Sequence, residues 1–296
     1  MKGIILAGGE GTRLRPCTLV VGKQLLPVYD KPMIYYPLST LIHAGVKEVL
    51  IISTPVEEER FRNLLGNGSN FGISIQYEVQ HAPSGIPQGI VIGKKFLGRS
   101  DFWFILGDNL FHGPEFGVKL SKLNSNLGAL IFAYRVQDPS SYGVVTFDPA
   151  GNKIVNLEEK PLQSYSKWAI PGLYKLDSRA VEIAEELEPS RRGELEILDL
   201  LSIYLKEDQL DCIKISRGNS WFDLGTPDQL LKASLYVQMI QERQGLLVGS
   251  PEEASVRSNL LTSKDLLKKL GKSENQYLKM LHSSLDTFVD IADNTH

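Results

Sequence analysis

Cysteine is nearly absent from this sequence, which has only Cys17 and Cys212 among its 296 residues. Two thiols cannot build a disulfide framework or a set of sulfur ligands for zinc. The sequence also lacks a Gly-x-Ser-x-Gly motif, and its five histidines are scattered without the spacing of metal ligands. The absence of these patterns argues against a disulfide-rich secreted scaffold, a structural zinc site and acyl-transfer hydrolysis.

Long hydrophobic runs and a strong net charge are missing as well. No uninterrupted apolar stretch approaches the ~20 residues that a membrane helix needs. The net charge is −3, without a long basic stretch, so the protein has no overall field that attracts a nucleic acid polymer. Glycine interrupts the first apolar residues too early for a signal peptide, and we therefore expect a cytoplasmic protein. An anionic ligand must be met by a few local cations or by a bound metal.

Short apolar runs typical of strands alternate with helix-like segments in the first 110 residues. We expect strands at residues 3–7, 48–53, 73–79 and 102–106, and helices at residues 33–44, 57–65 and 88–96. This order predicts an α/β fold, Rossmann-like, with a mixed, mostly parallel sheet and helices on both faces. Such sheets bind ligands at the carboxyl ends of their strands.

The rest of the chain changes character. Strand candidates at residues 129–134, 143–147, 153–158 and 169–174 indicate an antiparallel or mixed portion of the sheet, and Pro171 suggests an edge or a bulge there. Another strand is expected at 210–215 and a long helix at 227–244. Beyond residue 249 the pattern is helical, notably at 264–270 and 274–282, which predicts a small C-terminal helical appendage.

Three glycines, Gly8, Gly9 and Gly11, follow the first apolar run directly. Glycine has no Cβ, so backbone N–H groups in such a turn can approach a phosphate closely. The spacing fits neither a P-loop nor the dinucleotide pattern, which requires a glycine where Leu14 stands. The alternative is an ordinary tight turn at the surface.

Two cations belong to the same end of the first strand. Arg13 follows the glycines, and Lys23 comes ten residues later. Together with the glycine turn they favour a nucleoside triphosphate as ligand, whereas the alternative is that both side chains are merely solvated.

Two aspartates leave apolar stretches. Asp108 follows the run at 102–106, and Asp223 follows Trp221 and Phe222. Two carboxylates together with substrate phosphates are the usual ligands of Mg²⁺ in proteins. Asp223 alone could equally cap the helix that is expected to begin near Thr226.

Further charged residues are ambiguous when taken singly. Lys160 and Glu159 end a predicted strand and could be a solvated edge, or Lys160 could neutralise a second phosphate. Glu194, near the start of a helix, could complement the helix dipole or accept sugar hydroxyls.

Taken in order, five stretches resemble the sugar nucleotidylyltransferase family: residues 6–14 (LAGGEGTRL), 23–27 (KQLLP), 106–109 (LGDN), 158–161 (EEKP) and 192–196 (RGELE). Residues 29–39 and 242–246 resemble the members that use dTTP. The resemblance spans nearly the whole chain. It implies a Mg²⁺-dependent transfer of dTMP from dTTP to glucose 1-phosphate, giving dTDP-glucose and pyrophosphate. It also implies a homotetramer, entry into dTDP-rhamnose synthesis and feedback by dTDP-rhamnose at a second nucleotide site.

The resemblance also assigns residues. Arg13, Lys23 and Lys160 would be catalytic, the first two on the triphosphate and the third on the sugar phosphate. Gln80 and Gly85 would read the thymine, and Asp108 and Asp223 would hold Mg²⁺. The nucleotide would be bound by Leu6, Gly8, Gly9, Gly11, Thr12, Arg13, Lys23, Gln24, Gln80, Gly85 and Asp108, and the sugar phosphate by Asn109, Gly143, Glu159, Lys160, Tyr174 and Glu194.

A domain organisation is predicted from the same motifs and their order along the chain. We predict a catalytic domain over residues 1–245, with a nucleotide part over about 1–110 and a sugar-binding part over about 111–225, and an appendage over 246–296. The sequence departs from the family pattern near the base and sugar pockets, at Gly22, Ser84, Pro87, Gly89, Pro171 and Leu224. A relative that uses UTP or another hexose phosphate, or a non-catalytic regulator that binds sugar nucleotides, therefore stays open.

Overall fold

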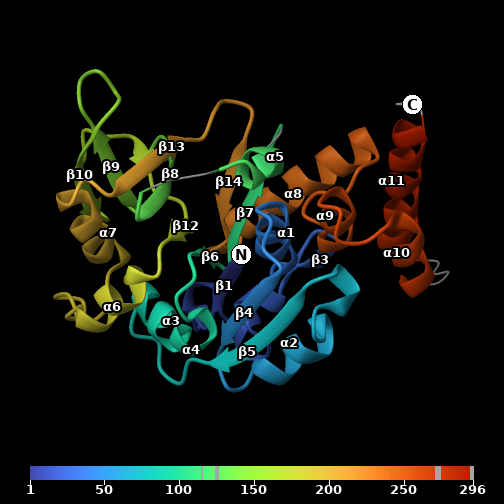
Figure 1. Cartoon of the computed structure of the whole chain (residues 1–296), viewed down its shortest axis with the longest axis horizontal. Coiled ribbons are helices and arrows are strands. Elements are labelled where there is room, and N and C mark those ends of the chain that lie inside the picture. The colour runs from blue at the N-terminus through green and yellow to red at the C-terminus, as the bar shows by residue number, and fades with distance from the viewer. Residues whose placement is uncertain (115, 124–126, 271–274, 294–296) are drawn as a thin grey trace.

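A ten-stranded sheet runs through the computed structural model, which describes residues 1–114, 116–123, 127–270 and 275–293. Its strand order is β10-β9-β11-β8-β12-β6-β1-β4-β5, and β13 pairs with β8 (Figure 1). The amino-terminal half of the sheet is parallel and consists of β1 (Lys2–Ala7), β4 (Glu48–Ser53), β5 (Ser74–Val79) and β6 (Phe102–Leu106). These are the strands expected from the sequence, within one residue at each end.

The second half of the sheet is mostly antiparallel. It contains β8 (Ala129–Arg135), β9 (Gly143–Phe147), β10 (Ile154–Glu159), β11 (Trp168–Ala169), β12 (Leu173–Leu176) and β13 (Leu210–Lys214), which is parallel to β8. The single strand predicted at 169–174 is wrong, because the chain there forms the separate strands β11 and β12. Pro171 lies between them and cannot donate a backbone hydrogen bond to a ladder.

Helices cover both faces of the sheet, as predicted. Consecutive residues of β1 point to opposite faces, so Ile5 packs with α1 (Tyr35–His43) and α2 (Glu58–Leu65), and Ile4 packs on the other side. That other side is covered by α3 (Ile86–Ile92), α4 (Lys94–Leu97), α6 (Arg179–Glu186) and α7 (Ile197–Lys206). The helix predicted at 88–96 is in fact two helices, α3 and α4, which meet at Gly93.

A two-stranded ribbon stands apart from the main sheet and was not recognised in the sequence. Its strands β7 (Asn109–His112) and β14 (Ser220–Asp223) are antiparallel, with Asp223 opposite Asn109 and Ser220 opposite His112. Both strands are too short to show a clear alternation of polar and apolar residues. A second small hairpin joins β2 (Pro27–Val28) to β3 (Lys31–Pro32).

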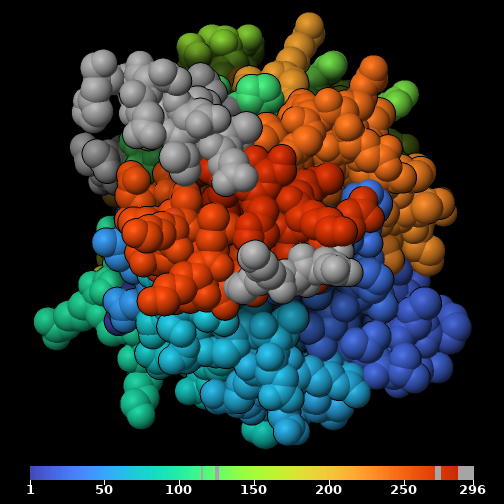
Figure 2. Space-filling model, turned by 90° about the vertical axis from the view of Figure 1, so that its right-hand side faces the viewer, coloured from blue at the N-terminus to red at the C-terminus, as the bar shows by residue number. Residues whose placement is uncertain are grey.

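The carboxyl-terminal part is helical. It consists of α8 (Pro227–Gln244), α9 (Pro251–Arg257), α10 (Ser263–Leu270) and α11 (Gln276–Asp293), while the short α5 (Phe116–Ser121) lies near β7. The helix predicted at 227–244 is confirmed; residue 274, where another was expected to begin, lies outside the described residues. Figure 2 shows α9 to α11 lying against the amino-terminal third of the chain. No helix within the described ranges has the length and apolar character required to cross a bilayer.

A buried lysine joins the β2–β3 hairpin to these helices. Lys31 is 3% exposed, and its Nζ donates to Asp30 at 2.5 Å and to Gln241 of α8 at 3.0 Å. The ammonium also lies over the rings of Tyr36 in α1 and Tyr277 in α11, at 5.1 and 5.6 Å from their centroids. A buried cation with these partners ties the appendage to the sheet-forming part, and the boundary at residue 245 stays a prediction.

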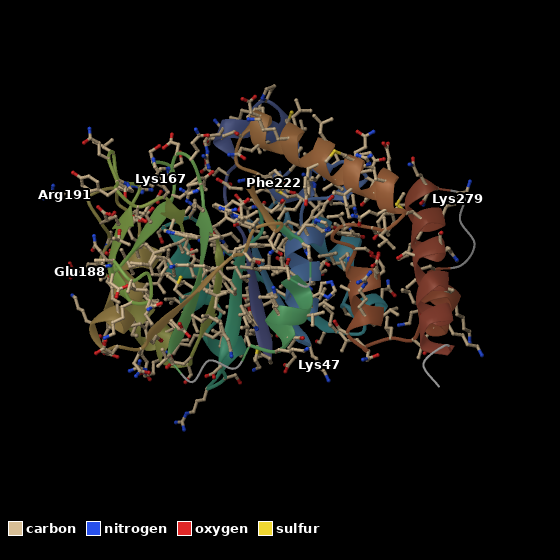
Figure 3. All side chains as sticks on the ribbon, turned by 90° about the horizontal axis from the view of Figure 1, so that it is seen from above. Lys47, Lys167, Glu188, Arg191, Phe222 and Lys279 are labelled. Carbon is tan, nitrogen blue, oxygen red and sulfur yellow. The ribbon has the colours of Figure 1, made fainter. Side chains whose placement is uncertain are left out.

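Other charged side chains lie mainly at the periphery. Figure 3 shows Lys47, Lys167, Glu188, Arg191 and Lys279 near the outline of the molecule. Charges that are instead buried beside the strand ends are therefore exceptional and mark candidate functional groups.

Candidate active site

The glycine turn follows β1 at the carboxyl edge of the parallel strands. Gly11 adopts a left-handed backbone, with a φ of 62°, just before a short 3₁₀ turn over Thr12–Leu14. Gly8 is required for another reason, because a Cβ there would lie 2.0 Å from Oε1 of Gln80. Nothing lies within 4 Å of a Cβ placed on Gly9, so the turn faces open space at that point.

Lys23 and Asp108 form a buried ion pair beside this turn. The Lys23 side chain, from a 3₁₀ turn over Lys23–Leu25, donates to Oδ2 of Asp108, which follows β6. Asn109 donates to the other oxygen, Oδ1, at 2.9 Å. Burial by itself raises the pKa of Asp108, but the charge and hydrogen bond of Lys23, with the Asn109 hydrogen bond, hold it below its ordinary value. Asp108 is therefore an ionised carboxylate.

Asp223 lies next to Asp108 because of the ribbon. It ends β14 opposite Asn109, and the following Leu224 donates its backbone N–H to the carbonyl of Asp108 at 2.9 Å. Burial and the charge of Asp108 raise the pKa of Asp223, while Lys23 and Arg13 oppose this shift. The alternative that Asp223 caps the following helix is wrong, since Thr226 caps α8 by accepting from the Gln229 N–H at 3.3 Å.

Arg13 completes the group. A Cβ on Gly225 would lie 2.8 Å from Nη2 of Arg13 and 3.0 Å from Oδ1 of Asp223, so the guanidinium and the carboxylate flank the same glycine. Arg13 and Gly225 line a pocket of about 240 Å³, and Asp223 lies beside it. Its lining brings together most of the predicted nucleotide residues: Leu6, Gly9, Gly11, Thr12, Arg13, Lys23, Gln24 and Asp108, with Leu106 and Gly225.

The two aspartates suit a divalent cation. Burial and then the charge of Asp108 raise the pKa of Asp223, so two ionised carboxylates here are unfavourable, and a divalent ion between them would remove this cost. Among the described residues no group of three or more histidine, cysteine or acidic side chains could hold a metal. The remaining ligands of such an ion would have to come from substrate phosphates and water, as is usual for Mg²⁺.

The predicted base-reading residues lie at the edge of the same region but do not line the small pocket. Gln80 follows β5, is 3% exposed and contacts the Gly8 position. Gly85 has a φ of 110°, and a Cβ there would lie 2.1 Å from the carbonyl oxygen of Leu195, which pairs with it in an isolated bridge. No other residue fits this position without moving the backbone before α7.

The predicted sugar-phosphate residues gather at the lip formed by β9 and β10. Glu159 pairs in register with Gly143 and lies 3.5 Å from both Lys160 Nζ and Arg192 Nη1. Burial raises the pKa of Glu159, and the charges of Lys160 and Arg192 oppose this rise. The position of Glu194 differs from expectation: α7 begins at residue 197, so Glu194 is a loop residue whose carboxylate pairs with Arg192 at 3.0 Å.

Tyr174 connects the two groups. Its side chain is 3% exposed, and burial together with the charges of Glu159 and Asp108 raises the pKa of its hydroxyl. Asn109 is 2% exposed, and its Oδ1 accepts from the Gly172 N–H at 3.0 Å and from Trp221 Nε1 at 2.6 Å. Its polar atoms are therefore occupied in holding Asp108 and the ribbon.

Sequence reasoning missed several residues of this region. Trp221 holds Asn109, and its ring contacts that of Tyr142 with centroids 5.0 Å apart. Burial and the charge of Asp223 raise the pKa of Tyr142, whose hydroxyl accepts from Gln229 at 3.3 Å. The only available signal was adjacency, because Trp221 and Tyr142 are close in sequence to Asp223 and Gly143.

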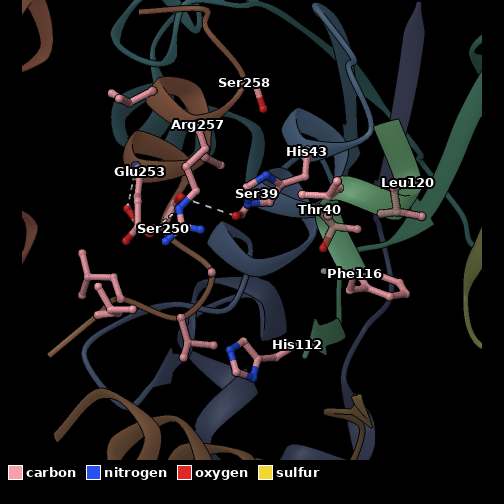
Figure 4. Close-up of a pocket in the computed structure, with 18 of the residues that line it drawn as sticks. Ser39, Thr40, His43, His112, Phe116, Leu120, Ser250, Glu253, Arg257 and Ser258 are labelled. Carbon is pink, nitrogen blue, oxygen red and sulfur yellow. Dashed lines mark hydrogen bonds and ion pairs between the residues drawn. The ribbon is translucent and has the colours of Figure 1, made fainter. Parts of the chain in front are cut away.

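A second, larger pocket of about 1500 Å³ lies between α1, α5, β7 and α9 (Figure 4). Arg257 pairs with Glu253 at 2.7 Å along one side, and His43 lies on α1, where burial lowers its pKa to about 4. His112, at the far end of β7 from Asp108, is 2.8 Å from the hydroxyl of Tyr236. The ribbon thus runs from beside the small pocket to the wall of the large one.

Comparison with known proteins places this arrangement in context. The sequence model of the family described as nucleotidyl transferase matches residues 2–239. The chain is 50% identical to a glucose-1-phosphate thymidylyltransferase of Mycolicibacterium smegmatis over 266 residues, covering 90% of this chain and 92% of the relative. It is also 50% identical over 267 residues to a protein of the same name from Neisseria gonorrhoeae, with the same coverage.

Solved structures of related proteins are similar to this one as well. A putative glucose-1-phosphate thymidylyltransferase from Bacillus anthracis, in complex with a sucrose, is similar with a TM-score of 0.74 and 38% identity, covering 80% of this chain and 94% of that one. A UDP-glucose pyrophosphorylase complexed with UDP-glucose has a TM-score of 0.70 at 24% identity, a likeness that concerns the fold alone.

Proposed function

The chain belongs to the nucleotidyl transferase family, and from that premise we propose that this enzyme transfers dTMP from dTTP to glucose 1-phosphate, with Mg²⁺ as cofactor. The products are dTDP-glucose and pyrophosphate. The observation that carries the proposal is the convergence of Lys23, Arg13, Asp108 and Asp223 beside the glycine turn. The names of relatives that cover 90% of the chain support the choice of substrates.

The chemistry requires alignment rather than a base. A phosphate oxygen of glucose 1-phosphate attacks the α-phosphorus of dTTP, a new P–O bond forms, and the bond to pyrophosphate breaks. The nucleophile is already ionised at neutral pH, so no general base is required. Lys23 and Arg13 would bind the triphosphate and stabilise the negative charge that develops on the departing pyrophosphate. Bound Mg²⁺, held by Asp108 and Asp223, would supply further neutralisation of the reacting phosphates.

The sugar end of the reaction has its own residues in this proposal. Lys160 would neutralise the sugar phosphate, while Glu159, Gly143, Tyr174 and Glu194 would surround the hexose. Their common location at the β9–β10 lip, with Tyr174 between this lip and Asp108, supports the assignment. The carboxylate of Glu159 is already held by two cations, which would leave its remaining lone pairs for hydroxyl groups.

A pyrophosphate-release assay tests the proposal directly. Purified protein is supplied with each of dTTP, UTP, ATP and CTP, with several sugar 1-phosphates, and with or without Mg²⁺. We expect turnover with dTTP, glucose 1-phosphate and Mg²⁺ to exceed every other combination. Highest turnover with UTP or another hexose phosphate would favour the related activity, and no release with any pair would favour a non-catalytic regulator. The presence of Arg13, Lys23 and both aspartates argues against a protein without catalytic activity.

Regulation belongs to the same proposal. We place feedback by dTDP-rhamnose, the end product of the pathway that this reaction would begin, in the large pocket. Its size of about 1500 Å³, its separation from the small pocket and the ribbon that runs from beside the small pocket to its wall support this placement. Saturation curves for dTTP with added dTDP-rhamnose test it, and inhibition that more dTTP simply overcomes would argue for binding at the catalytic pocket instead.

The oligomeric state is also proposed rather than established. Leu231, Leu235 and Met239 follow one stripe of α8 and are 60%, 55% and 48% exposed. Such a stripe suits contact between copies of the chain and supports the expected homotetramer. Sedimentation measurements test the state, and a monomer at micromolar concentration would contradict it. Location in the cytoplasm stays an expectation.

A further inference from the structure

Two glutamine side chains meet above the glycine turn. Gln80 follows β5, and Gln88 lies in the first turn of α3. Nε2 of Gln80 donates to Oε1 of Gln88 at 2.5 Å. An amide side chain can present either an N–H donor or a carbonyl acceptor, so its direction determines which ligand atoms it can bind. That direction must be inferred from neighbouring hydrogen bonds.

A backbone group fixes the direction of both amides. The N–H of Ser84 donates to the same Oε1 of Gln88 at 3.0 Å. A backbone N–H can only donate, so the Gln88 atom that faces it must be the oxygen. This oxygen also accepts a hydrogen bond from Gln80, so the atom of Gln80 that faces it must be the nitrogen. A flipped Gln80 would set two carbonyl oxygens against each other and lose the hydrogen bond.

The consequence appears on the other side of Gln80. Its carbonyl Oε1 is directed at the glycine turn, 2.0 Å from the position that a Cβ of Gly8 would occupy. Within the described part of the chain, no hydrogen bond is made to this oxygen. Gln80 is 3% exposed, so its hydrogen bond to Gln88, rather than contact with solvent, sets which end of its amide faces the turn. A ligand that reaches the glycine turn beside the small pocket would meet one fixed acceptor at this point.

A fixed acceptor selects a base that donates. Thymine and uracil carry an N–H at N3 at neutral pH, whereas N3 of cytosine is an acceptor. We infer that Gln88 is a positioning residue: it holds Gln80 as an acceptor for N3–H and so selects 2,4-dioxopyrimidine nucleotides against cytosine nucleotides. This inference rests on the proposed function, which places the base at Gln80.

The sequence departure at Ser84 fits this arrangement. Gln88 accepts its hydrogen bond from the backbone N–H of Ser84, and every residue except proline has this group. The side chain at position 84 thus has no part in setting the direction of the two amides. Specificity for N3–H does not depend on that side chain.

Substitution of Gln88 distinguishes a residue that orients the Gln80 amide from one that only stabilises the fold. In Gln88→Leu the partner of Gln80 is lost and its amide can present either end. In the matched control Gln88→Glu the carboxylate accepts from both Ser84 and Gln80, so the direction is kept. The measured quantity is kcat/KM for dTTP, dUTP and dCTP with glucose 1-phosphate and Mg²⁺.

We expect the dTTP to dCTP ratio to fall about 10- to 100-fold in Gln88→Leu, because a base that cannot donate is rejected when it covers a fixed acceptor and leaves it without a hydrogen bond. The dTTP to dUTP ratio should stay constant, since both bases carry N3–H. Gln88→Glu should keep the wild-type dTTP to dCTP ratio within about threefold. A residue that merely supports the fold would lower all three rates together and leave both ratios unchanged.

Binding of dTMP and dCMP, measured by calorimetry, gives the same ratio without turnover, and Gln88→Met serves if the leucine variant does not fold. An unchanged pyrimidine ratio in a folded leucine or methionine variant overturns the inference, as does an equal loss in Gln88→Glu or a wild type that does not discriminate. If the wild type binds dTMP over dCMP but releases no pyrophosphate, the proposed function has failed instead.

Discussion

The two pockets of this protein differ in size and in charge. The larger one is about 1500 Å³ and the smaller about 240 Å³, yet the smaller holds the buried Lys23–Asp108 pair and adjoins Asp223 and Arg13. The pKa of Asp108 is lowered by Lys23 and Asn109, whereas burial and the charge of Asp108 raise the pKa of Asp223. The comparison teaches that convergence of charged groups, rather than volume, marks the site of chemistry.

The location of each pocket explains the difference. The small pocket lies at the carboxyl ends of β1 and β6, where loops can bring side chains from distant segments together. The large pocket lies between helices and one end of β7, and much of its wall consists of helix side chains. A ligand bound there would not contact the charged groups of the small pocket.

Among the predicted effects on the two pockets, removal of one aspartate from beside the small pocket should be the largest. In Asp223→Asn we expect turnover with Mg²⁺ to fall by about 10³-fold or more, because one of the two charged metal ligands is lost. The folded state raises the pKa of Asp223, so its ionised form costs stability above the pKa of the unfolded chain, and the neutral amide removes that cost. At pH 7 the variant should therefore unfold at no lower temperature. Unaltered Mg²⁺ binding with nucleotide present, measured by calorimetry, would count against the assignment.

Arg13 should have the next largest effect. We expect Arg13→Ala to lower turnover by roughly 10²- to 10³-fold without unfolding the protein, as for loss of one preorganised donor to a developing charge. Arg15 is a matched control two residues away, since its side chain is exposed and pairs with the exposed Glu10 at 3.7 Å. Steady-state kinetics of both alanine variants test the role, and near wild-type turnover in Arg13→Ala would remove Arg13 from the mechanism.

The Lys31 cluster tests whether stability and chemistry separate. In Lys31→Met a buried ion pair loses its cation, which typically costs about 3 kcal/mol of unfolding free energy. Gln241 and Asp30 would lose the same partner, whereas the charges of the small pocket are untouched. Denaturation in urea measures the loss, and Asp30→Asn in the same chain should recover part of it. A fully stable Lys31→Met protein would show that the appendage does not depend on this contact.

The smallest effect is expected in the large pocket. Arg257→Lys keeps the charge beside Glu253 but loses the planar fork of the guanidinium. We expect inhibition by dTDP-rhamnose to weaken about tenfold, and to change more than turnover without inhibitor does. Inhibition curves for wild type and variant provide the test, while equal losses in both quantities would move the inhibitor to the catalytic pocket.

Most of the fold could be predicted because its strands are long and strongly apolar. β1, β4 and β6 have nearly every residue buried, so their runs stand out in the sequence. β7 and β14 have only four residues each and no visible turn between them, because they are far apart in the chain. Their pairing depends on tertiary contacts such as that of Trp221 with Asn109, which no local pattern reveals.

The candidate site was predictable in its charges but not in their supports. Arg13 is recognisable because it follows the glycine turn and Lys23 because it comes ten residues later, while Asp108 and Asp223 each leave an apolar stretch. The roles of supporting groups could not be predicted, since Gln88 and Trp221 act through hydrogen bonds to residues 8 and 112 positions away in the sequence. The assigned roles of the predicted site residues stay predictions until the variants are measured.

The β7–β14 ribbon has a consequence for how this protein can change. Asn109 beside the aspartates and His112 in the large pocket are separated by a fixed number of alternating residues. Insertion of a single residue between them would turn every later side chain to the opposite side. Surface loops tolerate insertions, but this short ladder fixes the spacing between the aspartates and the large pocket, so a change of its length alters both regions together.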